Sequence, residues 1–364
     1  MPSKVQKKRH FPVLAAVLIC GAVVCVILLV RFGTSGSRES DAAGFPISVN
    51  GLSVKQIGLM GGQIAVAEDA SFQLYNSSGS HRYTIDLNYS APVFITEGNR
   101  ALIYDRGGNR MKICNRGGEI GSREVDGQIL TCGLGGGHSA VATLSDSATS
   151  ILTVYDSNLL KEVFVWKTAS YITRLALSPN GRYVAVAVVN NDSGDIYSEV
   201  SVFDTKSTEP LFTNRYAGET ILDLRFQNSS DILVVTDRSI SGISGRDQLA
   251  FRTEFEYGSL SEVACTDNGN TALLLSKVSD GKDYVILYDK EGHLIQEFPI
   301  DSNARGLALS NSTVFVLYED KLQRFSSSGK NITPEELEVQ SNSIQVLAKG
   351  KTAYVLTSEE IQKF

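Results

Sequence analysis

The chain has 364 residues, of which 42% are hydrophobic and 20% charged, so it holds far too much apolar material for a disordered protein. Residues 1–43 carry six of the 34 basic and two of the 40 acidic residues, which leaves a net charge of -10 on the remainder. A body this acidic argues against a nucleic-acid partner. With four histidines and one tryptophan, the composition also argues against metal clusters, His-based catalysis and aromatic sugar platforms.

Residues 11–30 contain no charged side chain and follow the basic cluster at Lys7, Lys8 and Arg9. As a helix they would span about 30 Å, the thickness of the hydrocarbon core of a bilayer. A cleaved signal peptide is the alternative, but its apolar region is shorter and it ends at a small-x-small site, which residues 28–32 lack. We therefore expect one membrane anchor over residues 11–32. Because the basic flank is N-terminal, we expect residues 1–10 in the cytoplasm and the rest outside the cell membrane.

Residues 33–44 are small and polar and predict a flexible tether, so the body begins at residue 45. The body contains three cysteines, Cys114, Cys132 and Cys265, without a C-x-x-C pair. We expect buried thiols on strand faces, with a disulfide between two of them as the alternative.

A repeat of about forty residues runs through the body. Its landmark is a short β-rich run that ends in an aromatic or apolar residue, usually followed by Asn, Asp or Ser. The landmark residues are Tyr75, Cys114, Tyr155, Phe203, Ile243, Tyr288, Phe325 and Phe364, which lie 39, 41, 48, 40, 45, 37 and 39 residues apart. This period is typical of one four-stranded propeller blade.

The interior of a repeat supports the same fold. Residues 172–178, 183–189 and 199–203 form apolar runs that predict inner strands A, B and C, and residues 211–213 belong to strand D. The eighth repeat stops after strand C, and residues 45–49 are expected to supply its missing outer strand. We predict an all-β, eight-bladed β-propeller over residues 45–364. Seven blades are the alternative, because residues 240–243 look degenerate, and a two-domain β-solenoid is the third option. Residues 334–338 are expected to form one helical turn.

The short basic N-terminus, the anchor and the Ser178–Gly181 and Val202–Asp204 motifs together resemble an uncharacterised family of single-pass membrane proteins of Gram-positive bacteria with an extracytoplasmic propeller. The motif at residues 175–181 is more loosely similar to WD40-like and YVTN-type repeats. The resemblance implies the fold and the anchor, and it implies no activity or catalytic residue.

Several short motifs suggest chemistry but are better explained as turns. The glycine-rich segment at residues 133–138 lies where an A-to-B hairpin is expected and opens no helix, so it predicts a turn and not a phosphate cradle. Residues 192–195 and 280–283 lack the ligand spacing of a calcium loop. His81 and His293 are expected at the surface. We predict no catalytic residue, cofactor or metal site.

The expected B-to-C turns carry most of the acidic residues, whereas the A-to-B turns are nearly neutral. Turn chemistry alone favours Asp, so the acidic face has a local explanation as well as a functional one. We interpret the loops 190–198, 277–283 and 145–150 as a partner-binding surface, with candidate residues Asp146, Asp192, Asp195, Tyr197, Asp280 and Asp283. The expected function is a protein-binding, sensing or scaffolding module at the cell envelope. A propeller lyase or hydrolase with a site at the central channel is the alternative.

Overall fold

The computed structural model describes residues 44–49, 53–245, 248–255, 258–266, 268–277, 281–311, 313–326, 334–340 and 342–364. The expected anchor, nearly all of the expected tether, and Asp280 lie outside these residues. Within the described ranges there is no apolar helix of membrane-spanning length. Residues 44–364 form one compact unit.

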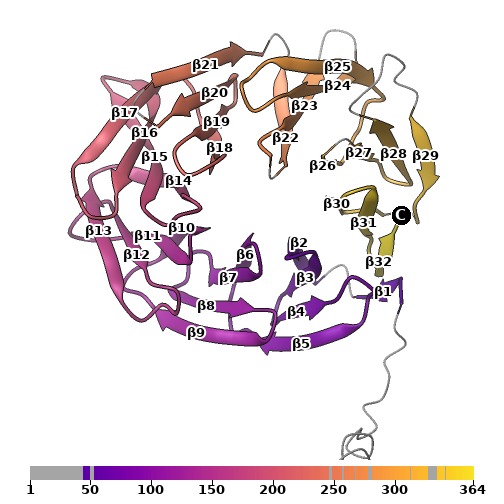
Figure 1. Ribbon diagram of the computed structural model, residues 1–364, viewed down its shortest axis with the longest axis horizontal. Coiled ribbons are helices and arrows are strands. Elements are labelled where there is room, and N and C mark those ends of the chain that lie inside the picture. The colour runs from indigo at the N-terminus through magenta and orange to yellow at the C-terminus, as the bar shows by residue number, and fades with distance from the viewer. Residues whose placement is uncertain are drawn as a thin grey trace, which may run out of the picture. The chain divides into compact units, whose positions relative to one another are not determined.

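The described part of the chain forms 32 strands, arranged as eight four-stranded antiparallel sheets that follow one another around a ring (Figure 1). Blades 1 to 4 are β2 (Val54–Met60), β3 (Gln63–Glu68), β4 (Ser71–Tyr75) and β5 (His81–Asp86); β6 (Pro92–Glu97), β7 (Arg100–Asp105), β8 (Arg110–Asn115) and β9 (Gly118–Glu124); β10 (Ile129–Gly135), β11 (His138–Leu144), β12 (Ser150–Tyr155) and β13 (Glu162–Thr168); and β14 (Tyr171–Leu177), β15 (Tyr183–Asp192), β16 (Asp195–Asp204) and β17 (Pro210–Ala217).

Blades 5 to 8 complete the ring, and the last of them begins at β30 and ends with β1. They are β18 (Ile221–Phe226), β19 (Ile232–Thr236), β20 (Ser239–Ser244) and β21 (Gln248–Glu254); β22 (Ser259–Cys265), β23 (Thr271–Lys277), β24 (Lys282–Tyr288) and β25 (Leu294–Ile300); β26 (Gly306–Ser310), β27 (Thr313–Leu317), β28 (Lys321–Ser326) and β29 (Glu335–Glu338); and β30 (Gln345–Lys349), β31 (Thr352–Leu356), β32 (Glu360–Lys363) and β1 (Ile47–Ser48).

The eight-bladed prediction is confirmed, and the seven-bladed and solenoid alternatives are wrong. The repeat that looks degenerate in sequence forms a complete fifth blade, because Ile240 and Ile243 are fully buried on β20 despite the small residues between them. The expected helical turn at residues 334–338 is also wrong. Residues 335–338 form β29, which pairs with β28 as the outer strand of blade 7.

The landmark of the repeat is the C strand and the turn that follows it. In five blades the Asn or Asp after the landmark accepts backbone N–H groups of the C-to-D turn through its side chain, so this residue holds the turn closed. These residues are Asn76, Asn115, Asp156, Asp204 and Asp289.

The core lies between neighbouring blades. One cluster joins blades 3 and 4, where Phe203 packs against Phe164 and Trp166, with ring centroids 5.8 and 4.8 Å apart. Since the B and C strands are covered by a blade on both sides, their sequences are continuous apolar runs, such as the buried stretch of residues 184–188 in β15.

Strand β1 closes the ring, as the sequence predicts. Ile47 is opposite Ile361 of β32, and the backbone N–H of Val49 donates to the carbonyl of Glu359 over 2.9 Å. The Ile47 side chain is 5% exposed, and the Phe45 ring lies 5.5 Å from that of Tyr354. β1 therefore covers the edge of β32 and supplies the outer strand of the last blade.

Among the described residues, two Gln side chains and one Glu side chain bridge the innermost strands of neighbouring blades. Gln56 accepts from the N–H of Phe94 over 3.1 Å and donates to its carbonyl over 2.9 Å, and Gln345 makes the same pair of bonds with Ile57 at 3.0 and 3.2 Å. Glu262 makes only one such bond, accepting from the N–H of Leu307 over 2.6 Å. Burial raises the pKa of Glu262, and the bond from Leu307 offsets only part of that effect.

Candidate functional site

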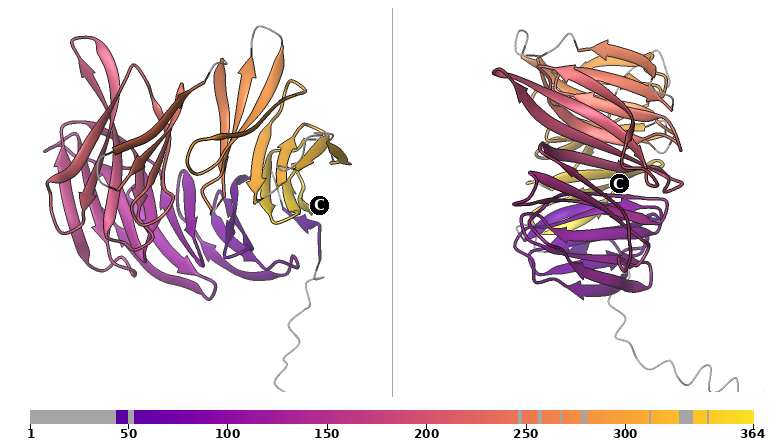
Figure 2. Two further views of the ribbon diagram at one scale, coloured as in Figure 1. Left: turned by 45° about the horizontal axis from the view of Figure 1, so that its top comes forward. Right: turned by 90° about the vertical axis from the view of Figure 1, so that its left-hand side faces the viewer.

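The ring has two faces, and the strands of each blade run between them (Figure 2). We call the face with the B-to-C turns and D-to-A connections the B–C face, and the opposite one the A–B face. The body begins at the A–B face, because a Cβ on Gly79, in the C-to-D turn of blade 1, would lie 2.7 Å from the carbonyl oxygen of Gly44. A D strand runs from the A–B face to the B–C face, so the assignment of residues 45–49 to the outer strand predicts from the sequence that β1 enters at the A–B face, as the structure shows.

The feature that stands out on the B–C face is the hairpin of β15 and β16, each ten residues long where the other strands have eight or fewer. The expectation of a loop at residues 190–198 is wrong. The strands stay paired as far as Asp192 and Asp195 and turn through Ser193 and Gly194, whose φ values are 54° and 102°. Such positive φ values at both turn residues match the twist of a two-residue hairpin.

The tip of this hairpin exposes both acidic and apolar groups. Asp192 and Asp195 are exposed, as is 58% of Ile196. Tyr197 is half-buried, because the Arg215 guanidinium stacks on its ring at 3.5 Å from the centroid. Tyr197 therefore supports the hairpin, while the two aspartates and Ile196 face solvent.

Other carboxylates of the B-to-C turns are committed to the ring itself. Asp105 accepts from the backbone N–H groups of Ser90 and Ala91 at 2.9 and 2.8 Å, and Asp237 accepts from that of Thr220 at 2.8 Å. Each of these bonds joins a B-to-C turn to the preceding D-to-A connection. Part of the acidic excess on this face is therefore structural.

Asp283, the second residue of β24, also binds a D-to-A connection, the one that follows blade 6. It is 8% exposed, accepts from the Ser276 hydroxyl at 2.8 Å, and accepts from the N–H of Ala304 at 3.3 Å. Its side chain is thus bound inside the ring, and reversing its charge would disturb the fold.

Asp146 lies in a groove of about 1210 Å³ on the B–C face, at the end of blade 3. The groove is formed by the B-to-C turn of blade 3 and by the D-to-A connections on either side of that blade, including Asp126, Lys167 and Tyr171. Tyr171 is 56% exposed. Sequence reasoning missed Asp126 and Tyr171, although both follow D strands and so lie on the same face as Asp146.

A cavity of about 1000 Å³ lies at the centre of the ring and is lined by all eight A strands. Charged groups in its lining are engaged by the protein: Arg225 Nε is 2.7 Å from the carboxylate of Asp223, and Arg174 donates to the carbonyl of Leu222 over 2.8 Å. No histidine lies among its described lining residues. The alternative of a channel enzyme gains no support from this lining.

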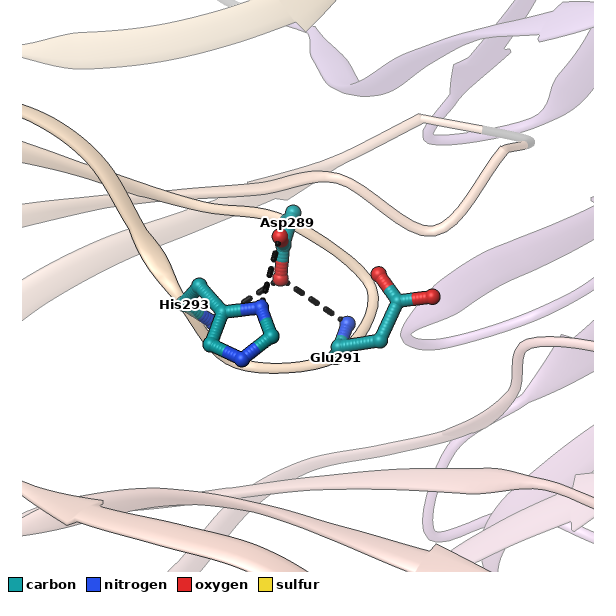
Figure 3. Close-up of side chains that lie close together, drawn as sticks. All are labelled: Asp289, Glu291 and His293. Atoms are coloured by element: carbon teal, nitrogen blue, oxygen red, sulfur yellow. Dashed lines mark hydrogen bonds and ion pairs between the residues drawn. The ribbon is translucent and has the colours of Figure 1, made fainter.

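One cluster in the described part of the chain has the composition of a metal site: Asp289, Glu291 and His293, in the C-to-D turn of blade 6 (Figure 3). Asp289 Oδ1 accepts from the N–H groups of Glu291 and His293 at 3.0 and 2.8 Å, and its Oδ2 lies 3.1 Å from His293 Nδ1. Burial raises the pKa of Asp289, but the bonds from His293 outweigh it and the pKa is lowered. Since Asp289 closes its turn as Asp156 and Asp204 do, the cluster needs no metal to explain it.

The three cysteines of the body, Cys114, Cys132 and Cys265, are free thiols, so the alternative of a disulfide between two of them is wrong. Burial raises the pKa of Cys114 to about 11 and also raises that of Cys132, which makes both thiols poor nucleophiles at neutral pH.

Solved structures similar to this chain share its fold at low sequence identity. BamB from Moraxella catarrhalis is 14% identical with a TM-score of 0.54, over 85% of this chain and 96% of that one. The WD40 domain of Neurospora crassa Pan2 is 10% identical with a TM-score of 0.51, over 85% and 88%. A eukaryotic initiation factor is 14% identical with a TM-score of 0.55, over 85% and 88%. These likenesses show a β-propeller.

No protein with a curated description matches the chain. A family model does match, over residues 48–364, which is the whole ring apart from its first residues. The chain therefore belongs to DUF5711, a family of unknown function.

Proposed function

We propose that this protein is a single-pass membrane protein whose propeller lies outside the cell membrane and binds a protein partner through its B–C face, as a scaffolding or sensing module of the cell envelope. The propeller fold is compatible with a binding or scaffolding role. The observation that carries the proposal is the β15–β16 hairpin, which extends beyond the other strands and ends in exposed Asp192, Asp195 and Ile196.

The direction of the chain supports this arrangement. The body begins at the A–B face, and the uncharged residues 11–30 precede it by a short polar segment. A ring tethered from that side presents its B–C face away from the bilayer. The acidic tip of the hairpin would then be kept from anionic lipid headgroups and offered to a partner.

Protease added to intact spheroplasts tests the placement. We expect digestion of the propeller and protection of the N-terminal segment, with all of the protein in the membrane fraction. Release into the medium of a protein shortened at its N-terminus would contradict the anchor.

Site-specific photocrosslinking tests the binding face. We expect Asp195→p-benzoylphenylalanine to give a discrete crosslinked species in intact cells. The control is Lys351→p-benzoylphenylalanine, at an exposed position on the A–B face. Crosslinks that form only from the control position would place the partner on the other face.

A further inference from the structure

We propose that the outer rim of the A–B face rests on the surface of the bilayer that the N-terminal segment crosses. The contact is made by exposed aliphatic residues in the C-to-D turns and at the start of the D strands of blades 2 to 6, which we call the apolar rim. Blades 2, 4 and 5 contribute Ile120, Leu211 and Leu249, blade 3 contributes Leu160 and Val163, and blade 6 contributes Leu294 and Ile295. The inference rests on the proposed function and adds a second contact with lipid to the anchor.

The exposed apolar residues of the ring gather at one end of its outer strands. Eleven large apolar side chains are exposed in the described part of the chain, and the apolar rim holds seven of them. All seven lie at the A–B face, because the C-to-D turns lie there and each D strand starts there. The other ends of the same strands expose no large apolar side chain among the described residues, and β9 and β21 end in exposed Glu124 and Glu254. General exposure of the outer strands therefore does not explain the apolar rim.

A repeated β-bulge presents four residues of the apolar rim. In blade 2, Ile113 and Cys114 of the C strand are opposite Gly121 and Glu119, so Ile120 is an extra residue without a strand partner. Five other blades have a bulge at the same point, and the extra residues of all six are Arg82, Ile120, Val163, Leu211, Ala250 and Ile295. All six are exposed. Since a bulge at a sheet edge re-aims side chains, the fold provides an outward position at the same level of these six blades, and four of the positions hold a large aliphatic residue.

The arrangement of the apolar rim suits a flat surface. Equivalent positions in the blades of a closed ring lie in one plane, and the rim follows five consecutive blades at one level. Single exposed apolar residues are ordinary in a soluble protein, but a series of them along one edge marks an interaction site. The interfacial region of a bilayer is flat, takes up aliphatic side chains, and lets neighbouring Lys side chains reach the headgroups.

The apolar rim and the N-terminal entry lie on opposite sides of the ring. The rim is centred on blade 4, whereas the chain enters at β1 of blade 8, four blades away (Figure 1). Residues 31–43 connect the uncharged run at residues 11–30 to Gly44 and reach at most about 45 Å. A connection this short keeps the A–B face near the bilayer at an effective concentration in the millimolar range, so weak contacts on the far side of the ring suffice to lay it flat.

Basic side chains accompany the apolar rim. Lys161 and Lys206 are exposed in the C-to-D turns of blades 3 and 4, and neither makes an ion pair among the described residues. Lys351 is exposed in the A-to-B turn of blade 8, on the same face. Each basic residue near a bilayer that contains anionic lipid strengthens the attraction to it. These three residues therefore favour the same contact as the aliphatic ones.

Most acidic groups of the same two C-to-D turns are engaged by the protein. Asp156 and Asp204 accept from backbone N–H groups of their own turns, and Glu162 pairs with Arg123 at 3.1 Å. Glu209 is the one carboxylate of these two turns without such a partner among the described residues. A body with a net charge of -10 therefore offers basic groups to anionic lipid at this rim.

Fluorescence of the full chain reconstituted in vesicles of phosphatidylcholine and phosphatidylglycerol tests the inference. Leu211→Trp and Leu294→Trp each add one reporter to a chain whose only tryptophan is Trp166, and the wild type gives the background. The quencher is phosphatidylcholine brominated on its acyl chains, which acts only on contact. We expect the added fluorescence to fall by at least about half for both rim variants, and to be unchanged for Ile196→Trp, a matched exposed position on the B–C face.

Variants assign the contact, with the quenched fraction of Leu294→Trp as the measure of docked against undocked ring. Adding Leu160→Asp and Leu211→Asp should lower that ratio at least about tenfold. The control adds Tyr171→Asp and Ile344→Asp, which carry the same charge at exposed positions of the B–C face and should leave the ratio unchanged. Adding Lys161→Gln and Lys206→Gln should lower the ratio at least about fivefold with anionic lipid and have no effect in pure phosphatidylcholine.

The inference fails if the rim variants are quenched no more than Ile196→Trp, or if aspartates on either face have the same effect. It also fails if the rim tryptophans shift to the blue without quenching and the shift fades as the protein is diluted in lipid, because a second copy would then cover the rim. Carbonate extraction of the same vesicles tests the anchor separately. A chain that resists extraction although its rim is not quenched would overturn the inference and leave the proposed function standing, whereas an extracted chain would overturn the anchor whatever the rim does.

Discussion

Replacing Glu262 by Gln tests how the inner edges of neighbouring blades are joined. Gln56 and Gln345 each give one donor and one acceptor to the next A strand, whereas an ionised Glu262 only accepts from Leu307. The side-chain amide that Glu262→Gln introduces would add a bond to the Leu307 carbonyl. One more such bond is worth about 1 kcal/mol, to which removal of a partly buried charge adds.

The expected effect is a rise in melting temperature that depends on pH. For a ring of about 320 residues the entropy of unfolding is about 0.7 kcal/mol/K, so 1 kcal/mol corresponds to about 1.5 °C. Because the pKa of Glu262 is raised in the folded protein, its stabilising contribution is complete below about pH 4.5 and is lost as the pH rises through the folded pKa. Protonated Glu262 can donate to the Leu307 carbonyl as a Gln amide does.

Thermal unfolding followed by circular dichroism from about pH 4 to pH 8 measures the difference. We expect Glu262→Gln and the wild type to melt together at the acidic end, and the variant to melt at least about 1.5 °C higher at pH 8. The reciprocal variant Gln345→Glu places a carboxyl group between blades 8 and 1. Its melting temperature should match that of the wild type at about pH 4 and fall below it at pH 8. A Glu262→Gln effect that is the same at both ends of the range, or a lower melting temperature at pH 8, would refute the reasoning.

Ile47→Ala should lower the free energy of unfolding by about 2–4 kcal/mol, because it leaves a cavity at a buried position of the closing strand. The control Ser48→Ala, at the exposed neighbouring position, should have the melting temperature of the wild type. Equal melting temperatures of the two variants would show that β1 does not hold the ring closed. Burial raises the pKa of Glu219, but the bonds from Thr236 and Ser239 and its Arg252 partner outweigh this and lower it. The contribution of ionised Glu219 to the free energy of unfolding is therefore present above about pH 4.5 and lost at lower pH. In urea unfolding, Glu219→Gln should lower that free energy by about 2 kcal/mol at pH 7 and by less below pH 4. A loss of stability that does not depend on pH would contradict this sign. Asp289→Ala should lower the melting temperature by about 1–2 °C, and Zn²⁺ should not raise that of the wild type; a zinc effect that disappears in the variant would show a metal site after all.

The number of blades could be predicted because the repeated sequence pattern corresponds to a local structural feature of each blade. In five blades the residue after the landmark, such as Asn76 or Asp156, closes the C-to-D turn with its own side chain, so a local signal that recurs in the sequence marks the end of the C strand. The same regularity predicts ring closure, because the eighth repeat lacks a strand and residues 45–49 have no other partner. Both conclusions hold although blade 5 looks weak in sequence.

The role of each carboxylate could not be read in the same way. Asp195 and Asp283 both sit next to hairpin turns of similar composition, yet one is exposed and the other accepts from the N–H of Ala304, 21 residues away. An aspartate accepts such a bond only where a D-to-A connection passes close to it. The path of that connection depends on packing between strands that are far apart in the sequence.

By itself, the sequence determined the all-β class, the eight repeats, the strand that closes the ring, and the side at which the body begins. The repeat is a local pattern in the sequence, and the direction of each strand follows from counting the strands that precede it. Only the tertiary structure decided that residues 190–198 form a hairpin, that Asp283 is buried, and that Asp126, Asp146 and Tyr171 line one groove. Those facts depend on pairing and on contacts between blades. A turn residue has no fixed exposure until its neighbours are in place.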